Sequence, residues 1–106
     1  MGCMFAECNS LININLSNFN TQNVSIMSYM FVSCNSLTNI DLSNFTAEKV
    51  TDLHKMFDGC KSLTNLNLSN FNAQKEIYMD SIFDGCNSLR RENIITNDIK
   101  ILNKFN

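Results

Sequence analysis

The chain repeats one eight-residue pattern four times, and the copies begin at positions 4, 30, 56 and 82. They read MFAECNSL at 4–11, MFVSCNSL at 30–37, MFDGCKSL at 56–63 and IFDGCNSL at 82–89. A fixed period of about 20–50 residues is typical of chains in which each unit buries its apolar face against the next unit. We therefore predict one right-handed solenoid domain over residues 1–106, because a chain of this length forms a single domain.

The period divides the chain into units, and each unit has two differently patterned parts. We place the repeats at about 4–29, 30–55, 56–81 and 82–94. In the second unit, Leu37, Ile40 and Leu42 enclose an alternation of apolar and polar residues that predicts a short strand with one buried face. In the part that follows, apolar residues recur at steps of three and four, which is typical of an amphipathic helix. They are Val50, Leu53, Met56, Phe57 and Cys60.

The Asp-Gly pair at 58–59 would end this helix, because glycine readily adopts the left-handed conformation that follows a last helical turn. The predicted class is therefore α/β: a leucine-rich-repeat-like right-handed solenoid of about four strand–helix coils. A parallel sheet would cover one side and short helices the other.

After the last repeat, Ile99, Leu102 and Phe105 recur by three, and the candidate N-cap residues before them are Thr96, Asn97 and Asp98. We expect a cap helix over about 97–106.

Bulk composition excludes several classes of function. The net charge is −2 and no basic run occurs, which argues against nucleic-acid binding. No apolar stretch approaches the roughly 18 residues needed to cross a membrane. We find no charged segment followed by an apolar one at the start, and so expect no signal peptide in this chain.

Cysteine is the one residue type with redox or metal potential that recurs with the period. Four of the five cysteines occupy the same repeat position, and Cys3 lies outside it. Such a column places each thiol where a small apolar side chain stacks on its copy, and buried free cysteine behaves as a small hydrophobe. We predict reduced core thiols. Disulfides, or a thiol-based redox or metal module, are the alternatives.

No catalytic constellation is visible. His54 is the only histidine, and its repeat position holds Ser28 and Asp80, so we expect it on an exposed surface. Metal-ligand spacings such as Cys-x-x-Cys are missing, as is a glycine-rich phosphate loop. We therefore predict a non-enzymatic chain that binds no cofactor and no metal.

The candidate binding surface is the exposed face of the predicted sheet. Between the buried strand positions the outward residues are mostly asparagine, and the columns would extend to Arg91 and Asn93. Stacked amides offer an array of donors and acceptors, and the sheet face is where solenoids often bind partners. The alternative is that these residues only solubilise the face and bond one another. The candidate residues are Asn13, Asn15, Asn39, Asp41, Asn65 and Asn67.

The repeat carries a family resemblance. Met-Phe, Cys-x-Ser-Leu and Leu-Ser-Asn-Phe recur in order, in the pattern MFxxCxSLxxIxLSNFxxxxVxxMxxMF. Over residues 4–94 this unit resembles the 26-residue repeat of BspA-like bacterial surface proteins, a leucine-rich-repeat family also described as a domain of unknown function shared by mycoplasma lipoproteins and gut bacteria. The Asp before Leu-Ser-Asn-Phe survives here only as Asp41.

The resemblance implies a cell-surface or secreted protein that binds proteins of a host or neighbouring cell, without catalysis. We therefore expect a protein-interaction module of an adhesin-like protein. The alternative is a structural spacer or self-associating repeat array without a specific ligand. Such an array would associate through the N-terminal edge, where Met4 and Phe5 begin the first repeat without a full unit before them.

Overall fold

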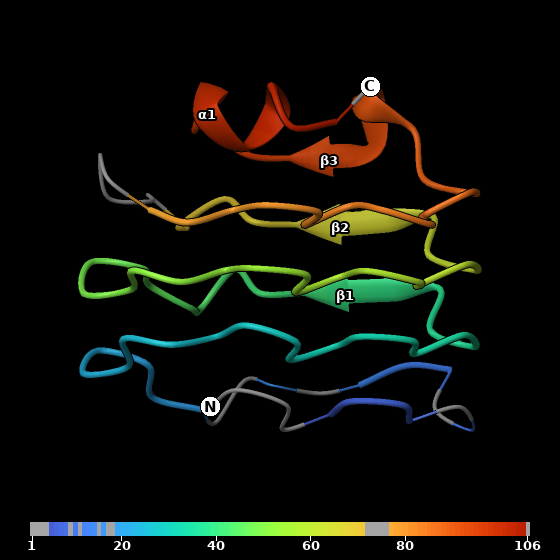
Figure 1. The fold of residues 1–106 in the computed structure, drawn as a ribbon, viewed down its shortest axis with the longest axis horizontal. Coiled ribbons are helices and arrows are strands. Elements are labelled where there is room, and N and C mark those ends of the chain that lie inside the picture. Colours follow the sequence, from blue (N-terminus) through green and yellow to red (C-terminus); the bar gives the residue numbers. More distant parts are fainter. Residues whose placement is uncertain are drawn as a thin grey trace.

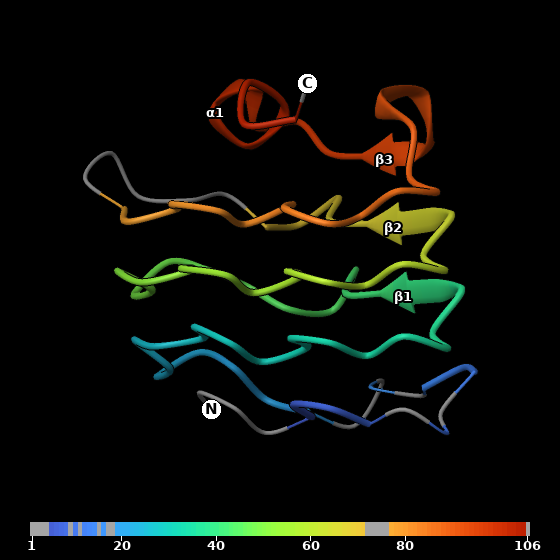
Figure 2. The ribbon, with the colours of Figure 1, turned by 45° about the vertical axis from the view of Figure 1, so that its right-hand side comes forward.

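The computed structural model describes residues 5–8, 10, 12–14, 16, 19–71 and 77–105. Successive repeats of the chain lie one above another, from the N-terminus at the bottom of Figure 1 to the C-terminus at the top. Three parallel strands stack in the order β1-β2-β3 on one side of this arrangement, as Figure 2 shows. They are β1 (Asn39–Asp41), β2 (Asn65–Asn67) and β3 (Ile94–Ile95).

The strands pair in the register that the repeat predicts for the central units. Ile40 lies beside Leu66 and Asn39 beside Asn65, so each residue pairs with its own copy in the next unit. An isolated parallel bridge joins Asn13 to Asn39 in the same way. Ile40 and Leu66 are buried while Asn39 and Asn65 are exposed, since successive side chains of a strand point to opposite faces. The alternation read from the sequence therefore places the amides outward.

The last strand is shifted from that register. Leu66 pairs with Ile94 instead of the residue at 92, and Asn67 pairs with Ile95 instead of the residue at 93. The expected extension of the polar columns to Arg91 and Asn93 at the 26-residue spacing is therefore wrong, although Asn93 still lines the same face. A 3₁₀ helix, η1 (Arg91–Asn93), accommodates the shift. Ile94, rather than the charged residue at 92, thereby occupies the buried strand position, and burying an unpaired carboxylate would be costly.

The amphipathic helix predicted from Val50 to Cys60 is absent, and the prediction of helices on this side is wrong for the described residues. The segment is a series of turns, and from Leu53 to Gly59 every second N–H donates to the next unit. Leu53 donates to the Tyr78 carbonyl at 2.7 Å and Phe57 to the Ile82 carbonyl at 3.0 Å. An α-helix would require these N–H groups to bond four residues back within the same unit.

Two backbone features explain how an apolar spacing of three and four arises without a helix. Other N–H groups of the segment bond three residues back, as from Met56 to Leu53 and from Cys60 to Phe57. Lys55 and Gly59 adopt positive φ values of 54° and 78°, which bend the chain between turns. Consecutive turns that each close over three residues bury every third or fourth side chain, so they mimic helical periodicity.

The interior is filled by columns of identical side chains. Phe5, Phe31, Phe57 and Phe83 stack nearly parallel, with ring centroids 5.5, 5.7 and 5.9 Å apart in turn. Phe105 closes the column with an edge-on contact to Phe83 at 5.6 Å. These are favourable ring arrangements, and the column runs along the whole stack.

The C-terminal helix forms where expected but is shorter. α1 spans Ile99–Leu102, and the Asp98 carboxylate accepts the Lys100 N–H at 3.0 Å as its N-cap. The Ile101 side chain of this helix is buried, and Phe105 reaches back to Phe83. The helix lies at the end of the stack, beyond the last strand (Figure 1).

Candidate protein-binding face

The structure brings the predicted sheet-face residues together in two adjoining columns. Asn39 and Asn65 are joined directly, since the Asn65 side-chain amide donates to the Asn39 Oδ1 at 2.9 Å. Asp41 lies beside Asn67 in the strand register, and Asn13 bridges to Asn39. Asn15 lies outside the described residues. The contact between the two amides shows that part of this polarity is satisfied within the face.

A shallow hollow of about 340 Å³ crosses the three strands at this face. Asp41, Asn67 and Ile95 lie side by side on the three neighbouring strands. The Ile95 side chain is 56% exposed and gives the hollow an apolar side. Ile95 was not predicted, because the register shift of the last strand cannot be read from the 26-residue period. The hollow is lined by Asn39, Ile40, Asp41, Asn65, Leu66, Asn67, Glu92, Asn93 and Ile95.

The carboxylates give this hollow a negative potential. Hydrogen bonding from Ser43, whose N–H donates to Asp41 Oδ1 at 2.9 Å, lowers the pKa of the Asp41 carboxyl below its ordinary value. Asn67 occupies the same place one unit later, and its Oδ1 accepts the Ser69 N–H at 3.0 Å. Asp41 therefore stays ionised while its position is fixed by the turn that follows the strand. Glu92 adds a second carboxylate to the hollow.

An aromatic cluster on the turn side was not predicted. His54 is half-buried, stacks on Tyr78 with centroids 4.9 Å apart, and contacts Tyr29 edge-on at 5.3 Å. His54, expected on an exposed surface, is therefore partly covered by the two tyrosine rings. These three rings occupy different repeat positions, so an alignment of the units does not show them as a column.

Among the described residues the cysteine column is a row of free thiols, in which Cys8 is half-buried and the other three are buried. Cys34, Cys60 and Cys86 are buried, and each thiol donates to a phenylalanine carbonyl of the preceding unit, at 2.8, 3.1 and 3.1 Å. Burial raises the pKa of the Cys60 thiol strongly and that of Cys86 to about 12. Such thiols remain protonated and are poor nucleophiles. Cys3 lies outside the described residues.

Within the described part of the chain, no group of three or more His, Cys, Asp or Glu residues is arranged to hold a metal ion. None of the described helices is long and apolar enough to cross a membrane.

Together these observations describe a protein whose repeated sequence units pair in register, with a polar sheet face on one side and buried thiols inside. The chain belongs to the family described as Mycoplasma protein of unknown function, DUF285, whose model matches residues 1–100. No curated protein and no solved structure matches the chain.

Proposed function

We propose that this chain is a non-enzymatic protein-interaction module of a BspA-like leucine-rich-repeat surface protein, built as a solenoid. The observation that carries the proposal is the hollow across the sheet face. Its amides and Asp41 follow the strand register, Glu92 of η1 adds a second carboxylate, and the exposed Ile95 lies beside them. A partner would gain directional hydrogen bonds from the amides and apolar contact from Ile95.

The proposed partner is a protein exposed on a host or neighbouring cell, and the proposed location of the chain is the cell surface or the medium. Both follow from the family resemblance of the repeat. The carboxylates of Asp41 and Glu92 in the hollow favour a partner that presents basic side chains to this face, because complementary charges speed encounter and fix orientation.

The test compares two charge-matched sets of variants in a cell-binding assay. Fluorescently labelled chain is titrated onto cultured epithelial cells and measured by flow cytometry. Asn39→Lys with Asn65→Lys places cations in the hollow, and we expect at least about tenfold weaker binding. Asn35→Lys with Gln22→Lys makes the same charge change at exposed positions that do not line the hollow, and should bind as the unaltered chain does.

Equal binding by both variants would refute the sheet face as the binding surface. Absence of binding by the unaltered chain to any cell type tested would favour the alternative, a structural spacer or self-associating array. That alternative draws support from the directional hydrogen bonding between units. Phe5, at the N-terminal edge, is already stacked on Phe31 and lies 6.0 Å from the Phe19 ring, whereas Met4 lies outside the described residues.

A further inference from the structure

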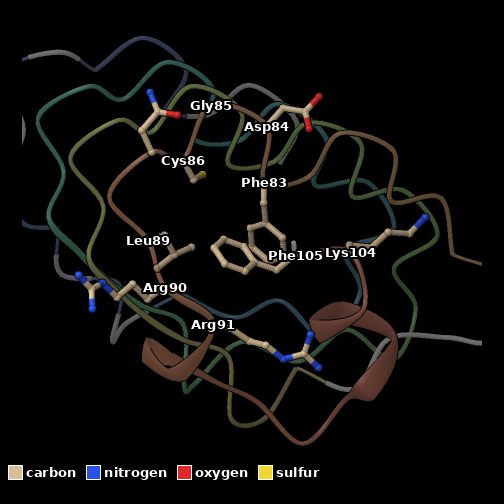
Figure 3. Close-up of a pocket in the computed structure, with 10 residues that line it drawn as sticks. Phe83, Asp84, Gly85, Cys86, Leu89, Arg90, Arg91, Lys104 and Phe105 are labelled. Carbon is tan, nitrogen blue, oxygen red and sulfur yellow. The ribbon is translucent and has the colours of Figure 1, made fainter.

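A second hollow, of about 570 Å³, opens at the C-terminal end of the stack, away from the sheet face. Figure 3 shows the Phe83 and Phe105 rings side by side at its centre. Cys86 and Leu89 complete an apolar floor, and their side chains are almost fully covered. The floor is the last level of the interior columns, and Phe105 covers part of it through its edge-on contact with Phe83.

The backbone at one side of this hollow carries hydrogen-bond donors without acceptors. In the unit below, Phe57 and Gly59 donate their N–H groups to the carbonyls of Ile82 and Asp84, at 3.0 and 2.7 Å. Phe83 and Gly85 are the equivalent residues of the last unit, and within the described part of the chain their N–H groups have no acceptor. Two donors at alternate residues match the carbonyl spacing of an extended peptide.

The rim of the hollow is positively charged, in contrast to the chain as a whole. Arg90, Arg91 and Lys104 outnumber Asp84, the carboxylate of this lining. Figure 3 shows both arginines on the opposite side of the aromatic rings from Gly85. Arg91 donates to the Leu102 carbonyl at 3.4 Å, while Arg90 and Lys104 are exposed and form no ion pair with a described residue.

We propose that this end hollow binds an extended acidic peptide segment of another protein, which adds one further rung to the stack. Its carbonyls would accept the Phe83 and Gly85 N–H groups, as the carbonyls of Ile82 and Asp84 accept those of the unit below. Its apolar side chains would cover the floor, and its carboxylates would pair with Arg90 and Lys104. Addition of an extended segment to an open edge is an established mode of peptide recognition. This inference does not rest on the proposed sheet-face function.

The probe is a short fluorescein-labelled peptide, about seven residues long, that alternates Val and Glu and has blocked ends. Binding is measured by fluorescence anisotropy. We expect saturable binding that Arg90→Glu with Lys104→Glu weakens by at least about tenfold. Lys49→Glu with Lys61→Glu changes the net charge equally at exposed positions that do not line the hollow, and should leave the affinity within about twofold.

A second measurement distinguishes backbone hydrogen bonding of the peptide to the Phe83 and Gly85 N–H groups from attraction between opposite charges alone. In an amide ¹H–¹⁵N spectrum, the peptide should shift the Phe83 and Gly85 resonances downfield and slow their exchange with solvent, while glutarate at matched carboxylate concentration should not. Equal responses to glutarate, or binding of a Val and Lys peptide at the same affinity, would overturn the proposal. So would a rise in solution mass without peptide that the rim variant abolishes, because a second copy would then occupy the hollow.

Discussion

The phenylalanine column allows a sharp test of how much the stacking of identical side chains stabilises this protein. Phe57 is fully buried between two parallel rings, at 5.7 Å from Phe31 and 5.9 Å from Phe83. Phe57→Leu keeps most of the apolar volume and removes both ring contacts. Each such contact is worth about 0.5–1.5 kcal/mol beyond burial, so the stacking loss is about 1–3 kcal/mol.

Phe71→Leu is the matched control. Phe71 is also buried, yet it makes no ring contact with a described residue, so its replacement costs only the changed shape and volume. Urea unfolding, followed by far-UV circular dichroism and tyrosine fluorescence, gives the free energy of unfolding of each variant. We expect Phe57→Leu to cost about 1–3 kcal/mol more than Phe71→Leu.

The double variant with Phe83→Leu isolates the ring pair, and its coupling free energy should be about 0.5–1.5 kcal/mol. Equal costs for Phe57→Leu and Phe71→Leu, with zero coupling, would refute the argument. The column would then be a consequence of the repeat and would add no stability of its own.

Three further predictions concern the thiols, the glycines and the cap. Burial raises the pKa of Cys60 and takes that of Cys86 from 9.0 to about 12. The unfolded state therefore loses these protons first, and the free energy of unfolding should fall above about pH 9 by up to about 1.4 kcal/mol per pH unit per thiol. Urea unfolding at several pH values measures this fall, and Cys86→Ala should reduce it. Gly85→Ala should destabilise more than Gly59→Ala in the same assay. At Gly85 the added Cβ would meet backbone atoms of Gly59 at 3.2 Å, whereas at Gly59 the nearest atom is a serine hydroxyl at 3.3 Å. The left-handed backbone alone costs about 1–2 kcal/mol in either variant. Asp98→Ala removes the N-cap bond of α1 and should cost about 1 kcal/mol, measured as a lower urea midpoint.

The strand positions were predictable from the sequence because alternating apolar and polar residues, repeated in each unit, indicate a strand with one buried face. Ile40 and Leu66 are buried and their neighbours are not, and the 26-residue register follows directly. The prediction failed on the turn side because apolar steps of three and four arise from helices and from consecutive three-residue turns alike. The positive φ values at Lys55 and Gly59 decide between them, and only glycine carries a sequence signal for such a conformation.

The candidate sites show the same division. The amide columns were predictable, because they depend on position within one unit. Ile95 and the His54 cluster were not, because each depends on a departure from the period: an inserted turn in one case, and contact between different repeat positions in the other. The end hollow could not be predicted either, since it depends on how Lys104 and Phe105, after α1, fold back beside Phe83.

Every second N–H group donates toward the C-terminal end of the stack in the turn segments from Met27 to Ser33 and from Leu53 to Gly59. This common direction determines how the number of repeats in the gene can change. Each of these units gives donors to its successor and offers carbonyls to its predecessor, as Ser33 donates to Asp58 and Gly59 donates to Asp84. A tandem duplication of the coding sequence for one repeat would therefore insert a unit whose two faces already match both neighbours. Loss of one such segment would rejoin the remaining units equally well. Variation in the number of units should thus be tolerated far better than a small insertion within a unit, which would put the columns above it out of register.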